Sequence, residues 1–206
     1  MRPLVLALAA FIACGPAAAQ SVWKLYPEIT EGFLLNFPGD PQVDNTKWEL
    51  VPGRLAPATV YSVKYNNAVF KMTVVDAAES YIKEDPIVAQ AIRKIGEGGK
   101  LNHNEPTRVE GLYGREISVA RPDGANTLAV IFYVNERLYI DETTGPSSAS
   151  SDMFLFLRSL VFDSHVKNRT KEQLDAWWYA CTRGATKDVI MPLQPSGPDD
   201  PRCAHD

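Results

Sequence analysis

The sequence predicts an α+β fold with an antiparallel β-sheet of about six to seven strands flanked by helices. Several segments alternate apolar and polar residues or are rich in β-branched and aromatic residues, which is typical of strands. Glycine, proline and asparagine separate these segments at short intervals, as hairpin turns require. Amphipathic segments interrupt and follow the strands, and this order of elements indicates an α+β domain.

The first strands are predicted before residue 80. Residues 33–37 are apolar at alternate positions, and the Pro-Gly-Asp-Pro sequence that follows ends the run. Residues 48–51 form a second candidate strand. Residues 60–65 and 69–75 are rich in β-branched and aromatic residues, and the Asn-Asn pair between them accepts positive φ at low cost. These last two segments are therefore expected to form a hairpin.

A helix is predicted over residues 86–95, where apolar residues recur at helical spacing. Asp85 is the expected N-cap, and Pro86 suits the first helical position because its missing N–H would have no helical partner there. The glycine-rich residues 96–99 end the helix, since glycine accepts the left-handed conformation that closes a helix.

Four further strands are expected at residues 107–112, 114–121, 127–134 and 137–142, with Pro-Asp-Gly and Asn-Glu sequences in the turns. Residues 128–134 are apolar on both faces. A strand of this kind is typical of the middle of a sheet that is covered on two sides.

Two more helices follow the strands. The first spans residues 150–159 and is expected to direct five apolar side chains toward the sheet: Met153, Phe154, Phe156, Leu157 and Leu160. The second begins at Thr170, whose spacing to Gln173 matches a capping box, and stops at Gly184. The tail beyond residue 190 is rich in proline and is expected to be irregular.

The N-terminus has the pattern of a cleavable signal peptide over residues 1–19. A charged start precedes about ten apolar residues and an Ala-Ala-Ala end, and the apolar run is too short to span a bilayer. Cleavage is expected between Ala19 and Gln20, which makes the mature protein periplasmic or secreted. A minority alternative is lipidation of Cys14, although Phe11 stands where a bacterial lipidation signal normally has leucine.

Cleavage would leave two cysteines, Cys181 and Cys203, in an oxidising compartment. An even number of cysteines in an exported chain predicts one disulfide, which would tether the tail. Two free thiols are the alternative.

Composition excludes several classes of function. Removal of Arg2 with the leader changes the formal charge from −4 to −5, and a mildly acidic chain without a basic stripe is unsuited to nucleic acid. The mature sequence has no second apolar stretch long enough to cross a membrane. Its length suits one domain with a full core.

Two motifs resemble a known family. Residues 33–41, FLLNFPGDP, look like the opening strand and Phe-Pro-Gly-x-Pro turn of small exported bacterial domains with the PsbP-like fold, and residues 154–162, FLFLRSLVF, are similar to the end of those domains. The resemblance covers roughly residues 23–163. The PsbP-like domain is therefore expected over residues 20–163, followed by a C-terminal helix and disulfide-tethered tail over residues 164–206. It implies the fold but no activity, because members of one fold perform unrelated functions.

No catalytic, cofactor or metal site is evident. The sequence contains three scattered histidines: His103, His165 and His205. Each is more typical of a solvated surface residue than of a catalytic group. Ser-x-x-Lys occurs at residues 164–167 and 21–24 without the other elements of penicillin-recognising enzymes. The glycine-rich residues 96–100 follow a helix rather than a strand, and Leu101 stands where a phosphate loop needs Ser or Thr. Together these patterns lean against an enzyme.

The predicted C-terminal helix carries three consecutive aromatic residues, Trp177, Trp178 and Tyr179, and one of them must point away from its apolar stripe. An exposed aromatic is typical of a partner surface, whereas packing on the domain is the alternative.

The leading hypothesis is a non-enzymatic periplasmic binding or assembly factor for another envelope protein. The alternatives are a small-molecule or lipid-binding module that uses the space between sheet and helix, and an unrecognised hydrolase. A large apolar cavity would favour the lipid-binding module, and a solid core would count against it.

Overall fold

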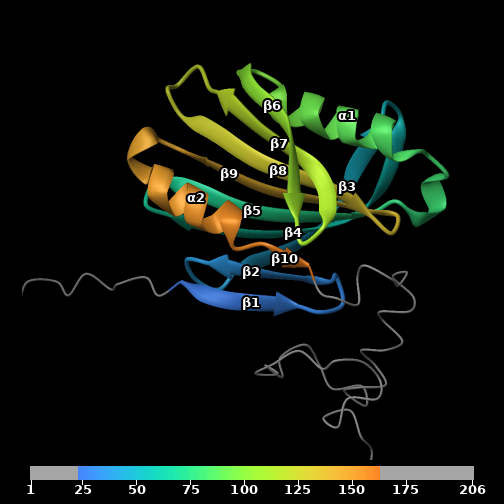
Figure 1. Cartoon of the computed structure of the whole chain (residues 1–206), viewed down its shortest axis with the longest axis horizontal. Helices are drawn as coiled ribbons and strands as arrows, with labels where there is room; N and C mark the ends of the chain where they lie inside the picture. The colour runs from blue at the N-terminus through green and yellow to red at the C-terminus, as the bar shows by residue number, and fades with distance from the viewer. Residues whose placement is uncertain (1–22, 163–206) are drawn as a thin grey trace, which may run out of the picture.

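The computed structural model describes residues 23–162 (Figure 1). The large sheet contains seven strands: β3 (Gln42–Val51), β4 (Arg54–Tyr65), β5 (Ala68–Asp76), β6 (Lys100–Val109), β7 (Leu112–Ala120), β8 (Asn126–Val134) and β9 (Arg137–Gly145). The small sheet contains three: β1 (Lys24–Glu28), β2 (Phe33–Phe37) and β10 (Val161–Phe162). The helices are η1 (Ala78–Ser80), α1 (Glu84–Gly96), η2 (Ser147–Ala149) and α2 (Ser150–Arg158).

The large sheet is antiparallel throughout and has the order β3-β4-β5-β9-β8-β7-β6. This confirms the predicted α+β class and the seven-stranded sheet. β8 lies between β9 and β7 and is buried along most of its length, as the apolar pattern of residues 128–134 predicted. The edge strands β3 and β6 lie at opposite ends of the sheet.

The small sheet was not predicted as a separate layer. β1 pairs with β2 from Lys24↔Phe37 to Glu28↔Phe33, and β10 pairs with the other side of β2. Its strand β2 was predicted correctly, but β1 was missed. β10 brings the end of the described chain back beside β2, so chain segments far apart in the sequence share this sheet.

Two cores lie on opposite faces of the large sheet. On one face, α2 and the small sheet cover aromatic residues such as Phe70 and Phe132, while on the other face α1 covers aliphatic residues such as Ile131 and Ile140. Phe156 of α2 packs edge to face against Phe37 and Phe70, with ring centroids 5.1 and 5.2 Å apart. The space between α2 and the large sheet is thus filled by packed side chains at these positions.

The hairpin turns follow the local sequence closely. Asn66 and Asn67 have φ of 47° and 60°, and Asn135 and Glu136 have φ of 48° and 60°, so both predicted turns are confirmed. Two consecutive positive φ values match the right-handed twist of the flanking strands. The predicted strand over residues 107–112 is wrong in its bounds: residues 107–109 belong to β6, but Glu110 and Gly111 form a turn of the same kind between β6 and β7.

The two edge strands were the hardest elements to predict. β3 begins at Gln42 rather than at residue 48, and β6 begins at Lys100 rather than at residue 107. The missed parts are polar and exposed on both faces, so they carry no apolar alternation. Their pairing with β4 and β7 is decided by the neighbouring strand.

Both predicted helices of the described range exist, with corrections. Lys83 occupies the N-cap of α1, and Asp85 lies in its first turn, where the positive end of the helix dipole favours a carboxylate. In α2, Phe154 was expected to face the sheet but is 45% exposed. Met153, Phe156 and Leu157 form the buried stripe of this helix. Among residues 23–162, no helix has the length and apolar character needed to cross a bilayer.

Candidate functional site

A pocket of about 690 Å³ lies where the β1–β2 hairpin meets β3 and β4. This volume falls within the range of small-molecule sites. We call it the acidic pocket, because three carboxylates line it together with two tyrosines: Glu28, Glu31, Asp76, Tyr26 and Tyr61. The other lining residues come from β3 and β4: Val43, Asn45, Thr46, Pro57, Ala58 and Thr59.

The carboxylates are positioned by short-range hydrogen bonds. Thr30 Oγ1 donates to Glu28 Oε1 at 2.5 Å, and the Glu28 residue is only 6% exposed. Thr59 Oγ1 donates to Glu31 Oε1 at 3.4 Å, which links the hairpin turn to β4. The backbone N–H of Ala78 donates to Asp76 Oδ1 at 3.2 Å. Each carboxylate is therefore held in place by a neighbouring donor.

Two side chains of β9 anchor the β1–β2 turn to the large sheet. Arg137 of β9, 2% exposed, donates from Nη1 to the carbonyl oxygen of Thr30 at 3.2 Å. The Tyr139 hydroxyl donates to the carbonyl oxygen of Glu31 at 2.9 Å. Gly32 closes the turn with φ of 77°. Two buried side chains of β9 thus hold the segment that carries two of the three acidic residues, and Arg137 places one positive charge beneath it.

The two tyrosines of the pocket have raised pKa values, chiefly because they are buried, and nearby carboxylates add to the shift. Burial raises the pKa of Tyr26 to about 12, and the charges of Glu28 and Asp40 act in the same direction. Burial also raises the pKa of Tyr61, with further contributions from Glu28 and Glu31. The two rings lie 5.8 Å apart between centroids. The part of each shift that comes from the carboxylate charges also favours a cation at this place, whereas the larger part, which comes from burial, does not.

The chemistry of the lining suits an organic cation. Among its described residues the pocket wall contains no Lys, Arg or His, and the face of a tyrosine ring attracts an ammonium or guanidinium group. A metal ion fits less well, because residues 23–162 contain no group of three or more His, Cys, Asp or Glu placed to hold one. The pocket is therefore best matched to a lysine or arginine side chain, or to a similar amine.

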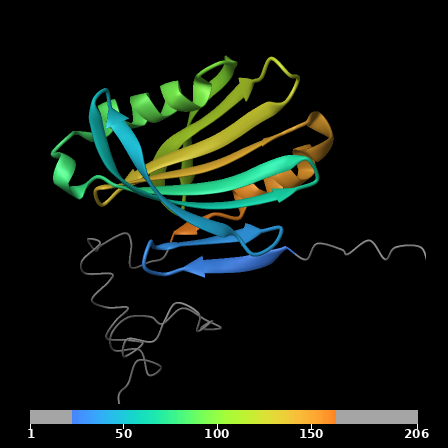
Figure 2. The same cartoon turned by 180° about the vertical axis from the view of Figure 1, so that it is seen from behind.

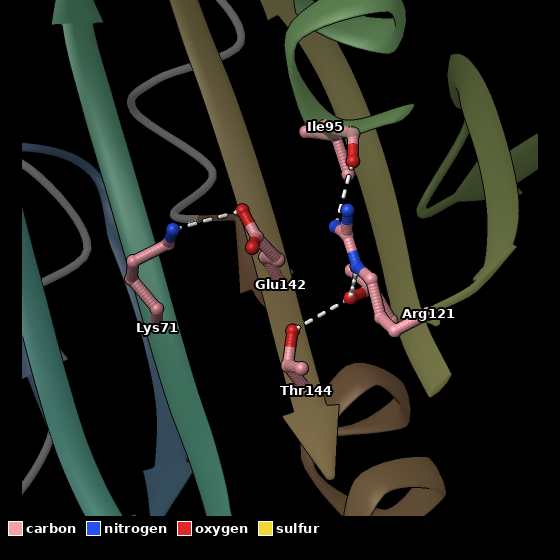
Figure 3. A network of polar contacts seen from close by, with 6 residues as sticks. Lys71, Ile95, Arg121, Glu142 and Thr144 are labelled. Carbon is pink, nitrogen blue, oxygen red and sulfur yellow. Dashed lines mark hydrogen bonds and ion pairs between the residues drawn. The ribbon is translucent and has the colours of Figure 1, made fainter. Parts of the chain in front are cut away.

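A cluster of polar side chains lies on the opposite face of the large sheet, where it stabilises the fold (Figure 3). Arg121 donates from Nη2 to Ile95 O at 2.7 Å and from Nη1 to Glu97 O at 2.8 Å, so a cation satisfies carbonyls at the C-terminal end of α1. Lys71 and Glu142 form an ion pair of 2.9 Å across β5 and β9. The charged groups of this cluster are thus paired with carbonyl oxygens or with each other, and we assign them a structural role.

Most of the predicted site residues lie outside the described residues. These are Ala19 and Gln20 at the cleavage point, Cys14, the Cys181–Cys203 pair and the aromatic residues Trp177, Trp178 and Tyr179. Of the histidines, His103 lies exposed on β6 opposite Ser118, and the other two are outside the range. The glycine-rich segment after α1 is a helix end, with Gly98 at φ of 72°, as predicted.

The acidic pocket was not predicted from the sequence. One signal for β1 was present, because residues 24–28 carry Leu and Tyr in a short extended pattern and Gly32 marks a turn before β2. The grouping of Glu28 and Asp76 had no such signal, since 48 positions and several strands separate them. Only the packing of the hairpin against β3 to β5 brings them to one pocket.

The protein is an α+β domain with a PsbP-like fold. The solution structure of cyanobacterial PsbP from Synechocystis sp. PCC 6803 is similar, with a TM-score of 0.50 and 10% identity over 73% of this chain and 97% of that chain. At this identity the likeness establishes the fold alone. The PsbP-like fold implied by the sequence is thereby confirmed, while its Phe-Pro-Gly-x-Pro motif is not tested by this comparison.

A Pseudomonas aeruginosa protein of unknown function also aligns, over 65% of this chain and 94% of that chain, at 16% identity. Its TM-score of 0.32 is too low to support an argument. No family model matches the chain, and comparison with curated proteins gives no match.

Proposed function

We propose that this protein is an exported, non-enzymatic binding domain that engages another envelope protein through a basic side chain seated in the acidic pocket. The observation that carries this proposal is the lining of three carboxylates and two tyrosines around one pocket. Carboxylates supply charge complementarity, and aromatic rings supply the apolar contact that interface anchors use. Export rests on the signal pattern of residues 1–19.

The two other hypotheses have less support. Around Phe156, packed aromatic side chains fill the space between α2 and the large sheet, which counts against a lipid-binding module there. A pocket of about 470 Å³ lies further along, between Leu157 and β6 to β8, and its lining includes the charged residues Arg108, Glu116 and Arg158. A hydrolase with a catalytic triad would need a histidine beside a nucleophile, and the one histidine among residues 23–162, His103, lies exposed on an edge strand away from the acidic pocket.

The pocket is tested by titrating the mature protein with N-acetyl-lysine methylamide and following backbone amide shifts by NMR. Residues around Tyr26, Thr46 and Thr59 are expected to shift in a saturable way. The norleucine analogue, which keeps the alkyl chain and lacks the ammonium group, is expected to shift them far less. Equal shifts with both probes would contradict a site for a cation.

Removal of two carboxylates from the acidic pocket is expected to weaken the binding of the lysine probe. The double variant Glu31→Gln, Asp76→Asn keeps acceptor oxygens for Thr59 and Ala78, so the pocket should keep its shape. Lysine binding is expected to weaken by about 3- to 10-fold, which corresponds to about 0.7–1.4 kcal/mol. The control variant Glu105→Gln removes an exposed carboxylate on the distant strand β6 and is expected to leave binding unchanged. Unchanged binding in the double variant would contradict the proposal.

Export and the disulfide are tested by mass spectrometry of the protein purified from the bacterial envelope. The N-terminal residue is expected to be Gln20, and the non-reduced chain is expected to be two hydrogens lighter than the reduced chain because Cys181 and Cys203 are paired. A chain that keeps residues 1–19 or begins at an acylated Cys14, or one that carries two free thiols, would contradict the respective prediction.

A further inference from the structure

The acidic pocket lies directly beside an open edge of the large sheet. β3 is the terminal strand of that sheet, and among residues 23–162 no strand pairs with its outer side. Its first six residues, 42–47, are all exposed, and Val43 is 47% exposed. Figure 2 shows β3 in light blue, running across the near side of the molecule from the small sheet toward α1. The covered part of β3 begins at Trp48, which packs against the core beneath α1.

An exposed strand edge presents a row of backbone N–H and C=O groups that can pair with another chain. Folded proteins usually protect such edges, and the opposite edge strand β6 is protected in two ways. Pro106 lacks a backbone donor, and the register shifts between Leu101 and His103. Residues 42–47 of β3 contain neither proline nor a register shift, since the irregularity of this strand lies beyond Glu49.

The charges around β3 define which chain would fit. Val43 and Asn45 lie on the face that carries the acidic pocket, and both line it. Asp44 points to the other face and is exposed. A strand laid beside β3 would run about 4.8 Å from it, close enough for long side chains to reach neighbouring residues. Basic side chains at alternate positions of such a strand lie on one face, where they would meet the carboxylates of the acidic pocket.

We propose that β3 accepts an extended segment of a partner protein by strand addition, with lysine or arginine at alternate positions and one of these side chains in the acidic pocket. This inference rests on the proposed function and adds that the partner binds as an extended strand. Backbone hydrogen bonds provide affinity in this mode of recognition, and pockets for alternate side chains provide specificity. The volume of the pocket, about 690 Å³, exceeds what a single side chain needs and suits a segment with its flanking residues.

The test uses a short alternating Thr-Lys peptide with capped ends and the mature protein, followed by NMR and amide hydrogen exchange. The peptide is expected to slow exchange at every second amide of residues 42–47 and to leave β6 unchanged. A version that is N-methylated on the amides facing β3 keeps its charges and loses its donors, so its affinity is expected to fall by about tenfold or more. An alternating Thr-Glu peptide is expected not to bind.

The outcomes separate this inference from the proposed function. If N-acetyl-lysine methylamide binds the pocket and the peptide gives no protection along β3, strand addition is wrong and the proposed function stands. If the N-methylated peptide binds as tightly as the unmodified peptide, strand addition is likewise wrong and the proposed function stands. If protection along β3 rises with protein concentration in the absence of peptide, a second copy of this chain occupies the edge, which also overturns the inference. If neither probe binds, both proposals fail.

Discussion

Replacing Asp141 with asparagine is expected to stabilise the protein at neutral pH, and the gain in the free energy of unfolding is expected to grow as the pH rises. Asp141 lies in the middle of β9, is fully buried, and neither of its carboxyl oxygens has a hydrogen-bond partner. Its neighbours in register are Met72 and Val130, which offer no donor side chain. Burial raises its pKa well above the ordinary value, and the charge of Glu142 acts in the same direction.

The sign of this effect follows from proton linkage. Because the pKa is raised in the folded state, the folded protein holds a proton that the unfolded chain releases above about pH 4. Stability is therefore full below the unfolded pKa and falls as the pH rises, by about 1.4 kcal/mol per unit while Asp141 remains protonated in the fold. The asparagine variant cannot ionise, so this loss is absent from it.

The measurement is urea unfolding of both proteins between pH 4.5 and 7.5. The advantage of Asp141→Asn is expected to grow across this range, whereas Glu105→Gln, an exposed control on β6, should follow the parent. Parallel curves for the parent and Asp141→Asn would show that Asp141 is ionised or hydrogen-bonded in solution. Thr143, the next residue on the same face, also has a hydroxyl without a partner, so the site is polar beyond Asp141.

Phe156→Ala is expected to destabilise the protein by about 3–5 kcal/mol, the range for truncating a large buried aromatic residue. Phe156 is fully buried, and its ring contacts Phe37 of the small sheet and Phe70 of the large sheet. Its loss would open a cavity where α2 and both sheets meet.

The same helix provides the control. Phe154 precedes Phe156 by two positions and is 45% exposed, so Phe154→Ala is expected to cost less than about 1 kcal/mol. Thermal or urea unfolding gives the loss of stability in each variant, and so compares the same substitution on the buried and the exposed side of α2. Similar losses in both would indicate that another surface covers Phe154 in solution.

Phe154 and Phe156 show that the apolar pattern of a helix predicts the helix but not which of its faces is buried. Both were predicted to face the sheet, because a run of apolar residues has more members than one helix face can bury. The stripe at helical spacing, which includes Phe156 and excludes Phe154, is recognisable only when the direction of the packing surface is known. The same limit applies to the edge strands, whose polar residues pair because a neighbouring strand offers partners.

The sequence by itself determined the elements whose cause is local. The Asn-Asn and Asn-Glu turns, the buried strand β8 and the glycine stop after α1 follow from backbone preferences and apolar runs within a few residues. The α+β class and the PsbP-like likeness follow from the order of these elements.

Only the tertiary structure decided the small sheet, the burial of Asp141 and the acidic pocket. The pocket combines Glu28 of β1, Glu31 of the turn and Asp76 of β5, and Arg137 of β9 anchors the turn that carries the first two. No short-range pattern connects these residues. They meet because the β1–β2 hairpin packs across a sheet whose strands come from the whole described chain.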